Sequence, residues 1–471
     1  MLICLTNSTG ADILRINLIC VSLGGACHQG LLLFFYRYYE EALFLQEVLF
    51  YGSILIFVVT YGLIIWEKYH RMVVAMSGGS IMLLFGFLNQ DTAIKEAIDF
   101  NTLGLLIGMM ILVTITRRTG VFEALAIWAA TVTEAYPLRL LALLSAITAG
   151  ASALLDNVTT VLLIVPVTIT LTDKLNINPL PFLISEIIAS NIGGTATLIG
   201  DPPNIMIGSA TGLSFNAFAS NLAPVSIIIL LATLLVLLFL YRNDLQVEEK
   251  DRLQVLKLNY KDEIKDSALL KKSLLVLGLT LSGFVFHSVL HLDSATVAMS
   301  GAIFLMLISK EEPEEILLNV EWPTIFFFIG LFVLVGGLKA SGVVGALAQW
   351  GLAVTQGQVM ETALLMLWLS AIASAFIDNI PFVATMIPML QEMAQLSGGN
   401  LEPVWWSLAL GACLGGNGTL IGATANVVVA GIAEKNGILL SFKHYLKIAF
   451  PLMIGSILIS HVYVYLRYFC V

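Results

Sequence analysis

The chain has 471 residues, of which 58% are hydrophobic and only 12% charged, and its formal net charge at pH 7 is −9. Soluble domains usually carry about a quarter charged residues, so this composition excludes an ordinary soluble protein. Many apolar runs approach the roughly 20 residues that a helix needs to cross a bilayer. The sequence therefore predicts an all-α polytopic membrane protein in a lipid bilayer. It has no basic block for nucleic acid outside one charge-balanced linker.

The N-terminal segment, residues 1–46, has the least regular pattern. It is not expected to be a signal peptide, because Asp12 and Arg15 interrupt its first apolar stretch and no basic region precedes that stretch. The run 16–36 is a candidate extra transmembrane helix. The cysteines show no Cys-x-x-Cys spacing, so neither a zinc site nor a disulfide framework is predicted.

The rest of the chain divides at a charged linker, residues 242–272. In the first part, 47–241, the apolar segments are expected at 48–66, 72–88, 100–116, 121–135, 138–172, 180–216 and 222–241. In the second part, 273–471, the same order of segments returns at 273–291, 294–309, 322–338, 343–355, 361–392, 404–433 and 447–466. The order predicts two transporter repeats joined by the linker.

The repeat is visible in individual letters as well. The pair Asp156-Asn157 returns 222 positions later as Asp378-Asn379. The same offset relates Gly193-Gly194 to Gly415-Gly416, Thr197-Leu198-Ile199-Gly200 to Thr419-Leu420-Ile421-Gly422, and Asn204 to Asn426. Chance similarity between apolar segments would not keep one register through so many polar and glycine positions, so we infer an internal duplication.

The number of membrane crossings predicts the orientation of the repeats. If each Asp-Asn stretch is a re-entrant hairpin, each half crosses the bilayer five times. An odd number places the halves in opposite orientation, as in many secondary transporters. With the linker in the cytoplasm, the inner face then receives most of the basic residues, as membrane proteins prefer: Lys68, Arg71, Arg117, Arg118, Arg139, Lys174, Lys310, Lys435, Lys443 and Lys447, against Lys95, Lys339 and Arg467 outside.

The two Asp-Asn pairs are expected to lie at the hairpin tips. Asp156 and Asp378 would cap half-helices that begin at Asn157 and Asn379. Capping alone is the simpler interpretation, but serine or threonine would cap without a charge. An ionised carboxylate inside a membrane indicates a functional site by default. Because a desolvated carboxylate prefers a proton or a cation beside it, such a site can couple proton and sodium movement.

A second motif interrupts a helix in each half, at residues 190–204 and 415–426. Paired glycines and the Pro202-Pro203 pair cannot continue a helix. Broken backbone at membrane depth is tolerated where it lines a cavity, and there it can offer carbonyl groups to cations and helix N-termini to anions. Asp201 is expected to cap the restarted helix in the first half only, since Ala423 stands at the matching position. The alternative is a proline kink that serves packing.

These motifs define the predicted site. Its acidic members are Asp156, Asp378 and Asp201. Asp156 and Asp378 could bind a sodium ion, and no other cofactor is expected. Neutral groups are expected from Asn157, Thr159, Asn191, Thr195, Asn204, Asn379, Asn417, Thr419 and Asn426. Glu186 could join a proton path, although a carboxylate near a span end is more often solvated.

The motifs resemble the P protein (pink-eyed dilution) family. The resemblance covers about residues 47–471 and rests on Leu155-Asp156-Asn157-Val158-Thr159-Thr160, Ile199-Gly200-Asp201-Pro202-Pro203-Asn204, Ile377-Asp378-Asn379-Ile380-Pro381 and Gly411-Ala412-Cys413-Leu414-Gly415-Gly416-Asn417-Gly418. That family belongs to the ion transporter superfamily, with arsenite-efflux carriers, NhaD-type sodium/proton antiporters and dicarboxylate/sodium symporters.

The resemblance implies inverted repeats, a homodimer and an elevator-like movement of the hairpins. In the dicarboxylate symporters a Ser-Asn-Thr motif occupies the tips; acidic tips suit a proton- or sodium-coupled carrier better. The long extracytoplasmic loop of P proteins is missing here. With the sequon Asn7-Ser8-Thr9, residues 1–46 are interpreted as a remnant of that loop or as an incomplete gene model.

The sequence thus predicts a secondary active transporter that exchanges protons against sodium or another small ion, in an organelle or plasma membrane. An anion carrier or channel for chloride, an oxyanion or a carboxylate is the alternative within transport. An intramembrane aspartyl enzyme is disfavoured because the Gly-x-Gly-Asp signature is absent, so no enzymatic activity is expected.

Overall fold

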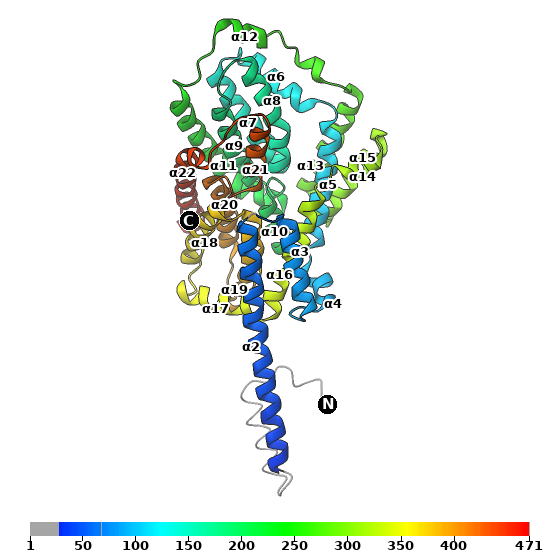
Figure 1. Cartoon of the computed structure of the whole chain (residues 1–471), viewed down its shortest axis with the longest axis vertical. Helices are drawn as coiled ribbons and strands as arrows, with labels where there is room; N and C mark the ends of the chain where they lie inside the picture. Colours follow the sequence, from blue (N-terminus) through cyan, green and yellow to red (C-terminus); the bar gives the residue numbers. More distant parts are fainter. Residues whose placement is uncertain (1–27, 67, 471) are drawn as a thin grey trace.

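The computed structural model describes residues 28–66 and 68–470, and within these ranges the regular structure is helical, without strands (Figure 1). The predicted all-α fold class is confirmed. The sequon and most of the candidate helix 16–36 fall in residues 1–27, outside the described part of the chain.

Eight helical segments of the described chain are long and apolar enough to cross a bilayer. They are Phe44–Trp66 at the end of α2 (His28–Trp66), α5 (Phe100–Arg117), α7 (Pro137–Leu154), α11 (Phe215–Tyr241), Ser267–His287 in α13 (Ser267–Leu290), α16 (Trp322–Ala340), α18 (Val359–Phe376) and α22 (Phe442–Tyr468). Shorter apolar helices are α3 (Arg71–Leu84), α6 (Val121–Val132), α14 (Ser294–Ser309) and α17 (Val343–Val354). The chain is a multi-pass integral membrane protein.

Further helices form around the two motifs or connect the spans. Those of the motifs are α8 (Asn157–Lys174), α9 (Leu180–Thr195), α10 (Pro202–Thr211), α19 (Asn379–Ser397), α20 (Glu402–Gly415), η3 (Gly416–Gly418) and α21 (Thr424–Lys435). The connecting ones are α4 (Gln90–Thr92), η1 (Ala93–Ala97), α12 (Glu249–Val255), η2 (Tyr260–Glu263) and α15 (Pro313–Leu318).

Each Asp-Asn pair separates two helices, as the sequence predicts. Asp156 is the N-cap of α8, and its carboxylate accepts a hydrogen bond from the backbone N–H of Thr159 at 2.8 Å. Asp378 is the N-cap of α19 and accepts from the N–H of Ile380 at 3.1 Å. In Figure 1, α7 and α8 lie in the upper half with the linker helix α12, whereas α18 and α19 lie in the lower half. The inverted, re-entrant arrangement stays a prediction that this placement favours.

Glycines bring the helices of each half into close contact. A Cβ atom on Gly193 of α9 would collide with the backbone of Ala149 in α7, and one on Gly415 would lie 2.5 Å from the carbonyl oxygen of Ala371 in α18. Small residues allow such close approach of membrane helices. We call α7–α10 the first hairpin unit and α18–α21 the second.

A different pair of glycine contacts holds the surrounding helices. A Cβ on Gly330 of α16 would lie 2.5 Å from the backbone nitrogen of Met76 in α3, and one on Gly108 of α5 would lie 2.7 Å from the backbone of Ala298 in α14. Helices α3 and α16, and likewise α5 and α14, therefore pack as tight pairs. We call these four helices the scaffold.

Candidate ion-binding site

The first hairpin tip presents a carboxylate without a cationic partner. Asp156 is 8% exposed, and besides the N–H of Thr159 it accepts the hydroxyl hydrogen of the same residue. Within the described chain, no basic side chain forms an ion pair with it. A buried carboxylate needs a compensating charge, a proton or further donors. Asp156 is therefore a place where a small cation or a proton would be stabilised.

The second tip differs because a guanidinium group neutralises it. Arg71, the first residue of α3, places Nη1 at 2.9 Å from Oδ2 of Asp378 and at 2.7 Å from Oγ1 of Thr424. The Thr424 hydroxyl also donates to Asp378 at 2.8 Å. The guanidinium lies 5.2 Å from the ring centroid of Phe327. Sequence reasoning counted Arg71 among the cytoplasmic basic residues and missed this role; its position at the start of an apolar helix was the available signal.

Asparagine side chains connect the two hairpin units. Asn157 donates from Nδ2 to Oδ1 of Asn191 at 3.0 Å, and Asn191 donates to Oδ1 of both Asn417 and Asn426 at 2.9 Å. These four amides are 3% exposed or less. The Oδ1 atom of Asn157 has no hydrogen-bond partner among the described residues. A buried amide oxygen beside a free carboxylate is the type of donor set that a hard cation prefers.

Two further amide contacts hold the broken backbone in shape. Asn204 donates to the carbonyl oxygens of Thr195 at 3.1 Å and Thr197 at 2.9 Å. Asn426 donates to the carbonyl of Thr419 at 2.9 Å, which is the matching contact in the other half. The role of these two predicted site residues in the structure is thus to satisfy carbonyls that the interrupted helices leave free.

The two threonines of the breaks use their hydroxyl hydrogens on the backbone. Thr195 donates to the carbonyl of Asn191 at 2.7 Å, and Thr419 donates to the carbonyl of Ala375. Both are fully buried. A hydroxyl that has donated its hydrogen still has lone pairs, so both oxygens remain able to accept a cation.

Asp201 is placed where the sequence predicts, but it does not act as a cap. It occupies the N-cap position of α10 and makes no side-chain cap hydrogen bond, so this part of the prediction is wrong. Its carboxylate instead accepts from Nδ2 of Asn379, at 3.3 Å to Oδ1 and 3.2 Å to Oδ2. Asp201 is only 1% exposed, and the amide from the opposite hairpin tip is a better-placed donor than its own helix. The contact joins the two hairpin units.

Glu186 also departs from its expected solvated position. It is fully buried on α9 and accepts a hydrogen bond from Thr168 at 2.6 Å. Its other oxygen, Oε2, has no partner within the described residues. The sequence placed this carboxylate at a span end, but the second arm of the hairpin, α8, covers it.

Several cavities touch the hairpin units. One of about 420 Å³ is lined by Thr159, Arg117 and Lys265, and one of about 510 Å³ by Lys339 and Gln391, among others. The lining of the first includes Glu123 of α6 and Lys265 of the linker, and that of the second includes Lys95 of η1 and Gln391 of α19. In Figure 1, α6 lies near the top and α19 lies far below it. A third, about 350 Å³, lies at the second tip, and its lining includes His70, Arg71 and Asp378.

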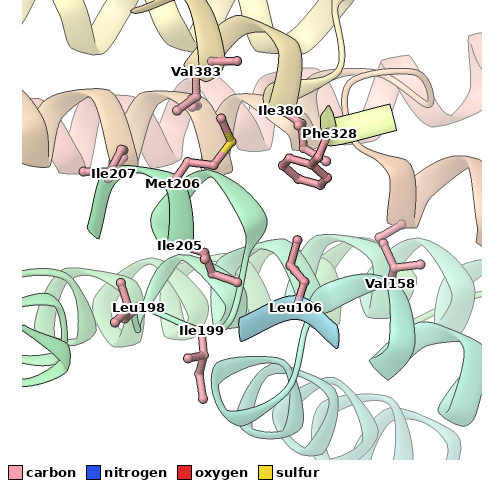
Figure 2. Close-up of a cluster of buried hydrophobic side chains, with 14 of the residues drawn as sticks. Leu106, Val158, Leu198, Ile199, Ile205, Met206, Ile207, Phe328, Ile380 and Val383 are labelled. Carbon is pink, nitrogen blue, oxygen red and sulfur yellow. The ribbon is translucent and has the colours of Figure 1, made fainter. Parts of the chain in front are cut away.

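Apolar side chains lie between the hairpin tips and the scaffold helices α5 and α16. Figure 2 shows Leu106 of α5 and Phe328 of α16 with Val158 and Ile380, the residues that follow the tip asparagines. All four are 8% exposed or less. Leu106 matches Phe328, and Val158 matches Ile380, at the offset of 222 positions. The contacts of the tips with α5 and α16 are therefore apolar in both halves, whereas α3 reaches the second tip through the ion pair of Arg71 with Asp378.

Among the described residues no group of three or more His, Cys, Asp or Glu side chains is arranged to hold a metal ion. A sodium ion would instead use the mixed carboxylate, amide and hydroxyl oxygens described above, as an ion in transit.

Comparison with known proteins places the chain in a family of transporters. The sequence pattern described as "Citrate transporter" (CitMHS) matches residues 61–411. An uncharacterised transporter of Mycobacterium tuberculosis is 44% identical over 426 residues, which covers 88% of this chain and 98% of that protein. The P protein of Mus musculus is 36% identical over 494 residues, covering 87% of this chain and 59% of that protein. The sequence-based resemblance to P proteins is thereby confirmed.

A solved structure supports the fold. The YdaH transporter of Alcanivorax borkumensis aligns with a TM-score of 0.56 at 14% identity, over 88% of this chain and 99% of that one. At this identity the similarity concerns the fold alone.

Proposed function

Because the chain belongs to the citrate transporter family and is a membrane transporter, we propose that it is a secondary active carrier that exchanges protons against sodium or another small cation. The observation that supports this most is the free carboxylate of Asp156 beside the unpartnered Oδ1 of Asn157. A proton and a cation would compete for the same oxygens, and mutually exclusive binding couples their movements.

An elevator movement of the hairpin units against the scaffold is the accompanying mechanism. The tight glycine contacts lie within the hairpin units and within the scaffold, whereas the contact between Leu106 or Phe328 and the tips is apolar. Apolar surfaces can slide without leaving polar groups unsatisfied. The cavity beside Thr159 reaches the first tip, and the cavity beside Gln391 lies against α10 and α19; in this mechanism each would open towards one side of the membrane. The homodimer implied by the resemblance stays a prediction.

The test is an ion screen in proteoliposomes with a pH-sensitive dye inside. We expect an imposed sodium gradient to move protons in the opposite direction, with potassium and choline as control cations. Absence of proton movement with every monovalent cation would contradict cation exchange.

A carboxylate or other anion is the second candidate. It is favoured by the guanidinium of Arg71 in the cavity of about 350 Å³, together with the description of the matching family. An anion would bind Arg71 in place of Asp378, and bidentate guanidinium pairing suits carboxylates. Uptake of a labelled dicarboxylate or tricarboxylate that requires Arg71, without sodium-driven proton movement, would favour this candidate.

A further inference from the structure

Of the two matched tip carboxylates, Asp378 alone has a basic ion-pair partner within residues 28–66 and 68–470, and that partner comes from the scaffold. Arg71 is the first residue of α3, and α3 is held against α16 at Gly330. Its partners Asp378 and Thr424 belong to the second hairpin unit. The ion pair therefore joins the scaffold, which would stay in place, to the second hairpin unit, which would move.

Among the described residues, the first hairpin tip has no equivalent of this contact. Ser294 starts α14, as Arg71 starts α3, and Pro202 stands where the second half has Thr424. Asp156 forms hydrogen bonds with Thr159, and no described basic side chain pairs with it. The asymmetry thus follows from two pairs of matched positions, Arg71 with Ser294 and Thr424 with Pro202, and is not a distortion of one side chain.

We propose that Arg71 is a tethered cation that latches the second hairpin unit to the scaffold whenever Asp378 holds no transported cation or proton. Asp378 can pair with Arg71 or with the transported ion, because both need Oδ2 and the Thr424 hydroxyl. When Asp378 holds a cation or a proton, it has no net charge left to attract Arg71, and the tip separates from α3. When Asp378 is empty, the ion pair keeps the tip bound to α3. The empty carrier cannot return, so every cycle exchanges one ion for another.

The partial burial of the pair supports this role. The side chains of Arg71 and Asp378 are 28% and 14% exposed, and both line the cavity of about 350 Å³. A small cation can therefore reach Asp378 while the pair is formed. The ion pair is buried enough to limit screening by salt, yet exposed enough for a transported cation to replace Arg71 at Asp378. This inference rests on the proposed cation exchange.

The first measurement is the ratio of protons to sodium ions moved by reconstituted protein. We expect Arg71→Gln to lower this ratio. We also expect this variant to release sodium into a pH-buffered medium roughly tenfold faster than wild type. The reason is that a hydrogen-bonded charge pair of this kind keeps about ten empty carriers latched for each one that is free. Arg71→Lys should retain most of the coupling. Lys68→Gln is the matched control: it removes a nearby positive charge that lies over the ring of Trp66 at 5.1 Å. An Arg71→Gln ratio equal to that of wild type would overturn the proposal.

The second measurement follows the latch without any transport. Spin labels at Tyr69 and Val427, which are 54% and 42% exposed and line the same cavity from the two parts, report the separation of scaffold and hairpin unit. We expect one short distance in wild type and in Lys68→Gln, and an added longer one in both Arg71→Gln and Asp378→Asn. An unchanged distribution in these two variants would overturn the latch. A changed distribution without sodium-driven proton movement would leave the latch standing and reject the proposed exchange.

Discussion

Asn379 at the second hairpin tip donates a bifurcated hydrogen bond to Asp201, which begins the restarted helix of the other half, with N···O distances of 3.3 and 3.2 Å. The contact connects the two hairpin units at the centre of the molecule, where Asp201 is 1% exposed.

A double-mutant cycle should detect this contact. We expect Asp201→Ala and Asn379→Ala to be coupled by about 1–3 kcal/mol in the free energy of unfolding in detergent, because the acceptor is charged and buried. The measurement is reversible unfolding of the two single variants and the double variant. Free energies that add within about 0.5 kcal/mol would mean that the two side chains do not interact.

Asp156→Asn should abolish proton-coupled flux without unfolding the protein. Asparagine can still cap α8, so the change in the free energy of unfolding should stay below about 0.5 kcal/mol. Flux is measured in vesicles with a pH-sensitive dye, at equal reconstituted amounts of protein. Asp173→Asn, which removes an exposed carboxylate from the other end of the same helix, is the control and should transport as wild type does. Coupled transport by Asp156→Asn at the wild-type rate would remove Asp156 from the mechanism.

Gly193→Ala should destabilise the first hairpin unit by about 1–3 kcal/mol, because the new Cβ would collide with the backbone of Ala149. Gly150→Ala is the matched control in the neighbouring helix α7, since nothing lies within 4 Å of its added Cβ. That control should raise stability by about 0.5–1 kcal/mol, as alanine favours a helix over glycine. Thermal denaturation in detergent compares the two, and equal melting temperatures would show that α7 and α9 are not in close contact.

Cysteines at Arg117 and Lys339 should react from opposite sides of the membrane. The two residues lie in the last turns of α5 and α16, are both exposed, and line the cavity beside Thr159 and the cavity beside Gln391, respectively. In sealed vesicles of known orientation, we expect an impermeant maleimide to label one position at least about tenfold faster than the other, because the bilayer excludes the reagent. Equal labelling of both positions from one side would reject the inverted arrangement.

The sequence predicted the local structure well. Asp156 and Asp378 begin helices where capping residues were expected, and the glycine and proline motifs interrupt helices at both expected places. These features depend on short-range backbone chemistry, which a few consecutive residues determine. The matched contacts of Asn204 and Asn426 with nearby carbonyls follow from the same local interactions.

Contacts between the halves could not be predicted in the same way. The pairing of Arg71 with Asp378 joins residues 307 positions apart, and that of Asn379 with Asp201 joins residues 178 apart. The constant offset of 222 relates equivalent positions but does not say which residues of one half touch the other. Asp201 was assigned to its own helix because capping is the nearest local use of such a residue, and only the tertiary arrangement supplies Asn379.

Two identical halves could not form the centre described here. A chain built from two first halves would place a carboxylate such as Asp201 and a guanidinium such as Arg71 on both sides, so that neither tip carboxylate would be left without a basic partner. One built from two second halves would have Ser294 in place of Arg71 and Ala423 in place of Asp201 on both sides, so that no guanidinium would reach either tip. Because both copies lie in one polypeptide, each can change independently of the other. The two halves of a chain that descends from a symmetric ancestor can therefore take different roles at the site.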